Sequence, residues 1–441
     1  MDWQSRAHIL ALGSATALAI GLVTPAWAHG VTERVSIGPS GAQAEFASYG
    51  PSISANGRFV AFWSASSNLV RGDTNGENDV FVRDRLKGMT RRVSLGADGV
   101  QGNQESTQPS ISANGRFVAF VSFASNLVPG DTNGIHDIFV RDRVNGTTER
   151  VSVGPHGVQA DSDSHEPSIS ADGRFVAFVS FASNLVPGDT NGRFDVFVRD
   201  RVNGTTERVS VGPRGVQADS ESEEPSVSAN GRFVAFWSGA SNLVPSDSNG
   251  HGDIFVRDRL RNTTERVSVG RLGVQGDGGT GSPAISADGR FVVFFSDATN
   301  LVPSDTNGIY DVFVRDRLKG TTERVSVGPR GVQADGYSIE PSISPDGRFV
   351  VFASFAGNLV RGVDTYWGKY RVFVHDRQLG TNRRVSVGPG GVDGDGDSGF
   401  NTGTPAVSAG GRFIAFGSFA TNLVPGDTNG EVDVFVRSLV P

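Results

Sequence analysis

The chain has 441 residues, a formal net charge of −7 and no cysteine. The negative charge argues against binding to nucleic acid or to an anionic membrane surface, because both need clustered positive charge. Without cysteine the chain has no disulfide, no thiol nucleophile, no thiolate metal site and no cysteine-linked lipid.

Residues 1–28 have the pattern of a secretory signal peptide. Arg6 precedes an apolar run over residues 9–23, and Ala26-Trp27-Ala28 follows as an A-x-A cleavage signature. The apolar run is shorter than the roughly 20 residues that span a bilayer. We therefore expect an exported protein, periplasmic or secreted, that does not insert into a membrane.

One sequence unit recurs through the rest of the chain. Its first proline returns at Pro51, Pro109, Pro167, Pro225, Pro283, Pro341 and Pro405, with five spacings of 58 residues and a sixth of 64. A long fixed period indicates stacked copies of one supersecondary unit. Residues 29–441 are therefore predicted to form a single domain of seven repeats.

Each complete unit contains four short β-rich runs. In the second copy they lie around Ile111 and over residues 116–122, 137–141 and 148–153. Asn114-Gly115 predicts a type I′ turn after the first run, since both residues tolerate positive φ. The second run is apolar on both faces, so both faces need to be covered. Four-stranded units that cover one another around an axis form a β-propeller.

The seventh unit lacks a fourth run, and the missing strand has its counterpart at the start of the domain. VTERVSIG at residues 31–38 resembles TTERVSVG at residues 147–154. We predict that residues 31–38 pair with the strand at 433–437 and close the ring, which covers an open sheet edge. The predicted fold is an all-β, seven-bladed β-propeller of four-stranded antiparallel blades, and we expect a monomer in solution.

The repeat resembles those of the TolB-like β-propellers of bacterial extracytoplasmic proteins. The match is carried by Ser344-Pro345-Asp346-Gly347, by the apolar strand at residues 349–352 and by the strand at residues 372–376. The resemblance extends over about residues 31–437. It implies the propeller fold. It does not imply one function, because such propellers serve as scaffolds, binding modules and substrate gates.

Chain direction places the loops on two faces of the ring. The turns after the first and third strands are short and share one face, here called the short-turn face. The loops after the second strand and the crossovers between blades are long and share the other, the long-loop face, and long loops often carry binding. The long-loop face is predicted to be acidic.

A D-x-N-G-x-x-D segment recurs in the long loops and could offer oxygen ligands to calcium. Its members are Asp73, Asn75, Asp79, Asp131, Asn133, Asp137, Asp189, Asn191, Asp195, Asp247, Asn249, Asp253, Asp305, Asn307, Asp311, Asp427, Asn429 and Asp433. The segment is shorter than an EF-hand loop and lacks its bidentate glutamate. A turn in which Asp and Asn bond the local backbone is the favoured interpretation, and no cofactor other than calcium is expected.

Blade six departs from the repeat, and its loops are the predicted partner site. Its second-to-third loop replaces the D-x-N-G segment with an aromatic sequence, and the crossover that follows is four residues longer than its counterparts. Together they carry Tyr366, Trp367, Tyr370, Asp393, Asp395 and Asp397. Aromatic rings and carboxylates suit a glycan or a basic peptide.

No catalytic motif is present: the sequence has no G-x-S-x-G, H-E-x-x-H or phosphate-loop pattern. We expect a non-catalytic binding or scaffold propeller that engages a protein or glycan through its acidic long-loop face, with no catalytic residue. One alternative is a glycoside hydrolase or lyase that uses loop carboxylates from distant blades. Another is a calcium-stabilised structural propeller.

Overall fold

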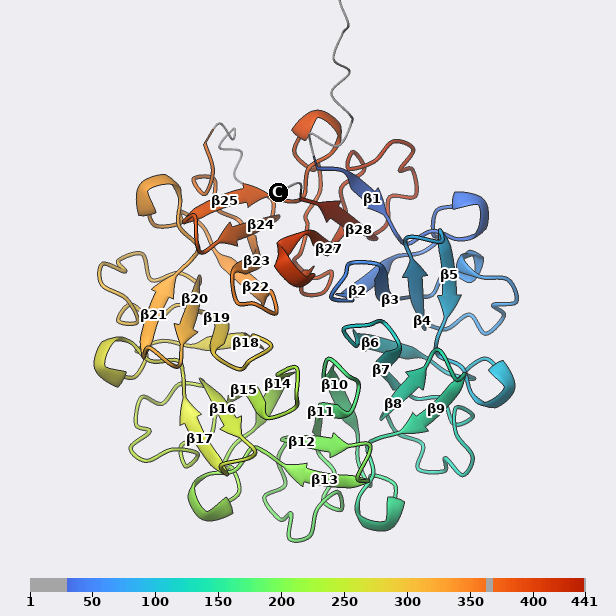
Figure 1. Ribbon diagram of the computed structural model, residues 1–441, viewed down its shortest axis with the longest axis horizontal. Helices are drawn as coiled ribbons and strands as arrows, with labels where there is room; N and C mark the ends of the chain where they lie inside the picture. The colour runs from blue at the N-terminus through green and yellow to red at the C-terminus, as the bar shows by residue number, and fades with distance from the viewer. Residues whose placement is uncertain (1–29, 362–367, 440–441) are drawn as a thin grey trace, which may run out of the picture.

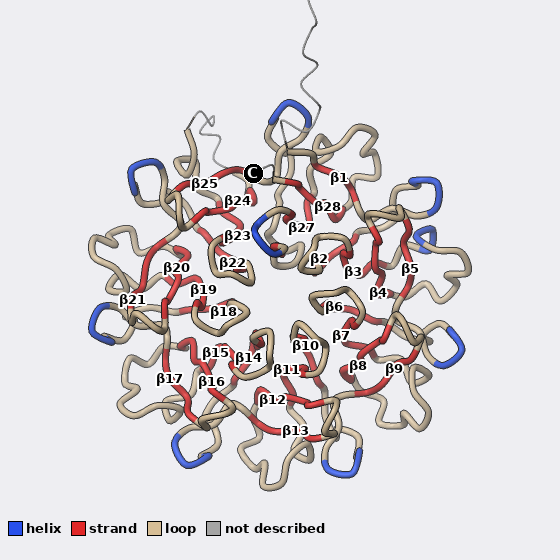
Figure 2. The backbone as a smooth tube through the Cα atoms, in the orientation of Figure 1, coloured by secondary structure: helices blue, strands red, loops and turns tan. Residues whose placement is uncertain are grey.

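The computed structural model describes residues 30–361 and 368–439, which form a ring of seven four-stranded antiparallel sheets (Figure 1). The first strand of each blade lies nearest the centre and the fourth lies at the rim (Figure 1). Most of the short 3₁₀ turns lie at the rim, whereas one lies near the centre beside β27 (Figure 2). The prediction of an all-β, seven-bladed propeller is confirmed. Within the described ranges, no helix is long and apolar enough to cross a membrane.

The strands of the first four blades follow the period of the sequence. They are β2 (Ser48–Ile53), β3 (Phe59–Ser64), β4 (Asp79–Asp84) and β5 (Met89–Arg92); β6 (Ser106–Ile111), β7 (Phe117–Ser122), β8 (Asp137–Asp142) and β9 (Thr147–Arg150); β10 (Ser164–Ile169), β11 (Phe175–Ser180), β12 (Asp195–Asp200) and β13 (Thr205–Arg208); and β14 (Ser222–Val227), β15 (Phe233–Ser238), β16 (Asp253–Asp258) and β17 (Thr263–Arg266).

The remaining three blades complete the ring. They contain β18 (Thr280–Ile285), β19 (Phe291–Ser296), β20 (Asp311–Asp316) and β21 (Thr321–Arg324); β22 (Ser338–Ile343), β23 (Phe349–Ser354), β24 (Arg371–Asp376) and β25 (Thr381–Arg384); and β26 (Ala406–Val407), β27 (Phe413–Ser418) and β28 (Asp433–Ser438) with β1 (Thr32–Arg34). The 3₁₀ turns are η2 (Pro39–Gly41), η3 (Ser67–Leu69), η4 (Ala97–Gly99), η5 (Pro155–Gly157), η6 (Pro213–Gly215), η7 (Arg271–Gly273), η8 (Pro329–Gly331), η9 (Pro389–Gly391) and η10 (Ala409–Gly411).

The predicted ring closure is confirmed. Strand β1 pairs antiparallel with β28, with Thr32 opposite Arg437 and Arg34 opposite Phe435. The fourth strand of blade seven thus comes from the start of the domain, and Figure 1 shows β1 beside β28.

The turn after the first strand of blade two was predicted to be type I′, and this prediction was wrong. Gly115 has a φ of 72°, but Asn114 is not left-handed, so the turn is not type I′. Gly115 donates its N–H to the carbonyl of Ser112 at 2.8 Å, and the Asn114 side-chain oxygen accepts the N–H of Arg116 at 2.9 Å. The Asn side chain therefore stabilises a longer turn in which only the glycine needs a positive φ.

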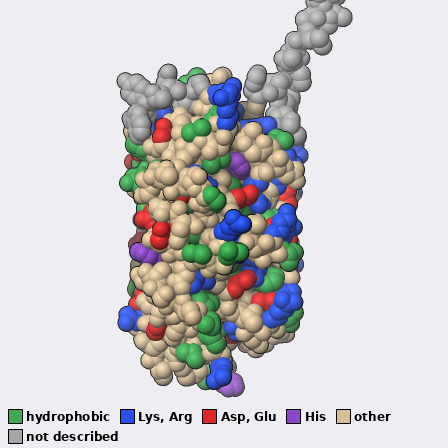
Figure 3. Space-filling model, turned by 90° about the vertical axis from the view of Figure 1, so that its left-hand side faces the viewer, with side chains coloured by type: hydrophobic (Ala, Val, Ile, Leu, Met, Phe, Trp, Pro, Cys, Tyr) green, Lys and Arg blue, Asp and Glu red, His purple; other side chains and the backbone are tan. Residues whose placement is uncertain are grey.

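The core lies between the blades and is repeated at each junction. Between blades two and three, Val121 and Ile138 pack against Val176 and Phe178, all at most 3% exposed. Both faces of the second strand are thereby covered, as its apolar sequence requires. Seen edge-on, the visible rim of the disk carries acidic and basic side chains interspersed with one another (Figure 3).

Candidate functional site

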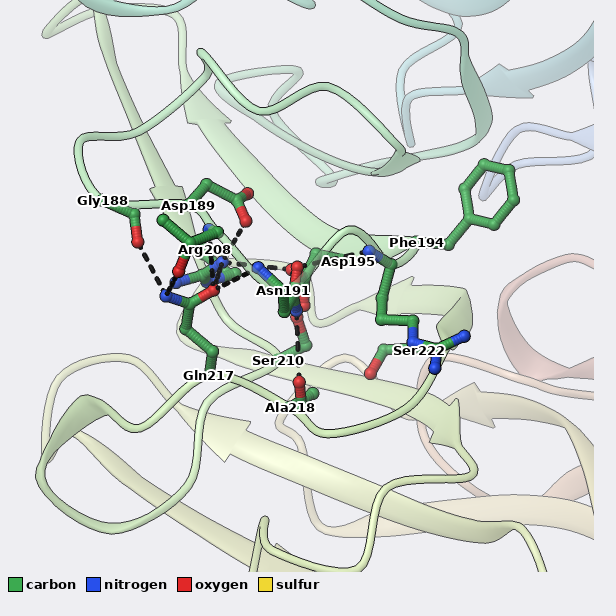
Figure 4. A network of polar contacts seen from close by, with 12 residues as sticks. Gly188, Asp189, Asn191, Phe194, Asp195, Arg208, Ser210, Gln217, Ala218 and Ser222 are labelled. Atoms are coloured by element: carbon green, nitrogen blue, oxygen red, sulfur yellow. Dashed lines mark hydrogen bonds and ion pairs between the residues drawn. The ribbon is translucent and has the colours of Figure 1, made fainter.

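The D-x-N-G-x-x-D loops form ion-pair networks around a buried arginine (Figure 4). In blade three, Asp195 opens β12 and is fully buried, and Arg208 ends β13. Arg208 Nη1 lies 2.8 Å from Asp189 Oδ1 and 3.1 Å from Asp195 Oδ2. Asn191 and Ser210 also donate hydrogen bonds to Asp195. Burial raises the pKa of Asp195, although these donors favour the charged carboxylate.

The same arginine-centred network recurs in every blade that has the motif. The central arginines are Arg34, Arg92, Arg150, Arg208, Arg266 and Arg324. In blade six the charges are exchanged, because Arg371 stands at the position of the buried aspartate. Asp393 then pairs with Arg384 and lies 3.7 Å from Arg371.

These arginines were not predicted as part of the site, although an Arg-Val-Ser sequence recurs within the fourth run of the repeat. The favoured interpretation of the motif was a local turn, and the structure adds a partner from the fourth strand. No group of three or more His, Asp or Glu side chains in residues 30–361 and 368–439 is arranged to hold a metal ion. Calcium binding stays a prediction, and calcium would compete with a guanidinium for the same oxygens.

The structure describes only part of the predicted partner site in blade six. Tyr366 and Trp367 lie outside the described residues. The Tyr370 ring stacks on Phe400 with 4.3 Å between centroids and meets Phe355 edge-on at 5.5 Å. Tyr370 is therefore half-buried within an aromatic cluster.

The three aspartates predicted with these aromatics bond to different partners. Asp397 accepts the N–H of Tyr370 at 2.6 Å. Asp395 accepts the N–H and hydroxyl of Thr421 at 2.7 and 2.8 Å, which lowers its pKa against the effect of burial. Asp393 belongs to the arginine pair described above. Each carboxylate thus fixes a loop, and only Asp397 contacts the aromatic cluster directly.

A groove lined by aromatic side chains opens over blades five and six, next to Tyr370. It has a volume of about 320 Å³ and is lined by Phe295, Tyr310, Tyr337, Ile339, Glu340, Tyr370 and Phe400. Tyr310 lies 5.1 Å from the Phe295 ring and 6.0 Å from the Tyr337 ring. Tyr337 is 48% exposed. The groove presents ring faces and hydroxyls on the long-loop face.

Glu340 links this groove to a second hollow at the mouth of the central channel. The hollow has a volume of about 350 Å³ and is lined by the residues before the repeat prolines, including Glu166, Glu224, Ser282, Glu340 and Thr404. Glu224 donates its N–H to Glu166 at 2.7 Å, and Ser282 donates its N–H to Glu224 at 2.7 Å. Each carboxylate is thereby held by the backbone of the following blade.

These channel residues have an unusual backbone. Glu166, Glu224 and Glu340 have φ values of 54°, 56° and 51°, in the left-handed region, and each lies at a bulge in its first strand. Such strain costs on the order of 1 kcal/mol or more per residue and is often found at functional sites. In the sequence, Glu166 and Glu224 are two among several acidic residues before the repeat prolines, and the bulge that aims them into the channel appears only in the fold.

Burial changes the protonation of the channel carboxylates. Burial raises the pKa of Glu224 to about 7. The hydrogen bond from the N–H of Ser282 opposes this shift, and the charges of Glu166 and Glu340 add to it. Burial also raises the pKa of Glu166 and Glu340. None of the three glutamates forms an ion pair in the described part of the chain. The channel can therefore hold or release a proton near neutral pH.

No protein-family model matches the sequence, and no curated protein sequence matches it. Solved structures that resemble it include oligogalacturonate lyase from Vibrio parahaemolyticus, at 11% identity and a TM-score of 0.54, covering 93% of this chain and 97% of the lyase. The β-propeller domain of the Trilobed protease from Pyrococcus furiosus has 15% identity and a TM-score of 0.54, covering 89% and 94%.

TolB from Acinetobacter baumannii is also among the structural neighbours, at 14% identity and a TM-score of 0.40, covering 87% of this chain and 81% of TolB. At such low sequence identities, the structural similarity to the lyase and to the protease domain shows only that this chain has a β-propeller fold.

Proposed function

We propose that this protein is an exported, non-catalytic binding or scaffold propeller that engages a glycan or protein partner through its long-loop face. The observation that carries the proposal is the aromatic groove of Phe295, Tyr310, Tyr337 and Tyr370, which runs to Glu340 at the channel mouth. Partly exposed aromatic rings beside a few convergent polar groups are typical of ligand sites.

A glycan is the partner chemistry that this groove fits best. Tyrosine ring faces can stack on a sugar ring, while their hydroxyls and the Glu340 carboxylate exchange hydrogen bonds with sugar hydroxyls. Among the residues that the structure describes, no arginine or lysine lines the groove. A neutral or cationic ligand is therefore favoured over an anionic one, which the channel glutamates would repel.

Replacement of both Tyr310 and Tyr337 with alanine is expected to weaken partner binding about tenfold or more, because each ring supplies roughly 1 kcal/mol of contact energy. Binding is measured by screening the mature protein against neutral glycans, uronate glycans and basic peptides. Tyr49→Ala is the matched control, since Tyr49 contacts Trp63 at 4.7 Å in blade one, outside the groove. Equal loss in both variants would contradict the groove as the site.

A hydrolase or lyase is the second candidate, and the raised pKa of Glu224 is the observation that favours it. A carboxyl group that titrates near pH 7 can serve as a general acid or base. Glu224→Gln keeps the shape of the side chain and removes this proton. Turnover of a bound glycan by the native chain, abolished in Glu224→Gln while binding persists, would replace the non-catalytic proposal with this one.

The raised pKa also predicts a pH dependence of stability. A carboxyl whose pKa is higher in the folded state contributes stability below its unfolded value, and this is lost as pH rises through the folded value. For Glu224 the window runs from about pH 4.5 to about 7. Over it, native stability should fall on the order of 3 kcal/mol more than that of Glu224→Gln.

Melting temperatures from pH 4.5 to 8 test this difference. Glu431→Gln is the control, because Glu431 is an exposed residue in the long loop before β28. Parallel pH profiles for the native chain and Glu224→Gln would show that Glu224 has an ordinary pKa.

A further inference from the structure

Neighbouring blades are joined on the short-turn face by an arginine that follows the third strand. Arg201 of blade three lies over the Phe117 ring of blade two, 4.7 Å from its centroid, and donates to the carbonyl of Gly173. It also forms an ion pair with Glu149, on the fourth strand of blade two. Including this one, the equivalent interblade ion pairs are Arg85–Glu33, Arg201–Glu149, Arg259–Glu207, Arg317–Glu265 and Arg377–Glu323.

At the junction of blades one and two the glutamate is replaced by Arg91. Arg91 lies opposite Val82 in the sheet, as Glu149 lies opposite Val140. The facing arginine is retained, because Arg143 lies 4.6 Å from the Phe59 ring centroid and donates to the carbonyl of Gly115. Two arginines thus line this junction where five of the other junctions have an ion pair.

A groove of about 370 Å³ opens at this junction. Arg58 and Arg116 line it, and each is neutralised by an aspartate, Asp84 or Asp142, at 2.7 Å. Lys87, Arg91 and Arg143 also line the groove, and none of them forms an ion pair in the part of the chain that the structure describes. The groove therefore holds three uncompensated positive charges.

The positive charges in this groove lie close enough to Arg143 to change its pKa. Burial lowers the pKa of Arg143; the charge of Asp84 opposes this shift, and the positive charges of Arg91 and Arg58 add to it. Arg91 itself is exposed, so its side chain is not fixed by packing. Repulsion of this kind is relieved when an anion lies between the two groups.

We propose that the groove between blades one and two binds an oxyanion of the phosphate or sulfate class between Arg91 and Arg143, with Lys87 as a third contact. Planar guanidinium groups match the oxygens of such anions in pairs, and lysine adds a point charge. The site lies on the short-turn face, opposite the aromatic groove, so it is independent of the proposed partner site.

The junction of blades six and seven provides an internal comparison. Arg383 replaces the glutamate there as well, but Leu439 lines the groove in place of the second arginine. Arg412 also lines this groove, and neither Arg412 nor Arg383 forms an ion pair in the described part of the chain. This groove therefore has two such cations, whereas the groove between blades one and two has three, which makes the latter the better oxyanion site.

Calorimetric titration of the mature protein with inorganic phosphate and with sulfate, at constant ionic strength, tests the proposal. We expect binding by the native chain and at least tenfold weaker binding by Arg91→Glu, which restores the ion pair with Arg143. Lys87→Ala should weaken binding about threefold. The tenfold change corresponds to the loss of one charge-assisted contact.

The matched control is Glu149→Gln, which breaks an interblade ion pair without adding a positive charge and should leave phosphate affinity unchanged. Melting temperatures show whether each variant is folded, and Arg91→Glu should melt no lower than the native chain. No binding of either anion by the native chain at millimolar concentration, or equal affinity in Arg91→Glu, would overturn the proposal.

Discussion

A variant that begins after Gly38 is expected to lose most of its stability, because β1 supplies the outer strand of blade seven. The truncation removes the fully buried Val35 and leaves β28 as an open sheet edge. It also removes Arg34 and Ser36, which donate to the buried Asp433. Burial of a valine contributes about 2 kcal/mol, and an orphaned buried carboxylate costs about 3–5 kcal/mol.

Together these losses of about 5 kcal/mol or more are comparable to the whole stability of many domains. We therefore expect a much lower melting temperature and association of the truncated chain through the open edge, measured by thermal melting and by light scattering. A variant that begins at Gly30 is the control, since it keeps β1. If both variants melt alike and stay monomeric, the pairing of β1 with β28 does not stabilise the ring.

The fold was predictable from the sequence because the repeat imposes the same geometry seven times. A unit with an apolar second strand cannot cover both of its faces alone, so the period and this strand together implied packing of blade on blade. The closing strand was predictable for a related reason: the seventh unit ends at β28, and the Val-Thr-Glu-Arg sequence of β1 matches the fourth strand of other units.

The sites were less predictable, because they depend on contacts between segments that the period does not relate. The motif Asp189-x-Asn191 showed oxygen ligands, but its cation, Arg208, comes from the end of β13, the second strand after the motif. Glu224 stood among other acidic crossover residues, and only the bulge at its positive φ aims it into the channel. The groove with Arg91 requires knowing which strand faces which neighbour.

Replacement of Arg208 with alanine is expected to destabilise the protein by about 3–5 kcal/mol, because it leaves Asp189 and Asp195 buried without a cation. Asp195 is fully buried, so water cannot replace the guanidinium. Urea denaturation of the variant and the native chain measures the difference. Arg214→Ala is the matched control, since Arg214 is exposed and makes no ion pair within residues 30–361 and 368–439.

The pH dependence of this loss separates a charge effect from a packing effect. Removal of the guanidinium should raise the pKa of Asp195 further above its unfolded value, beyond the increase that burial already causes. Stability of the variant then falls as pH rises through the folded pKa, so the deficit relative to the native chain should be larger at pH 8 than at pH 5. A deficit that is the same at both pH values would mean that Arg208 stabilises the blade through the packing of its aliphatic stem and not through its charge.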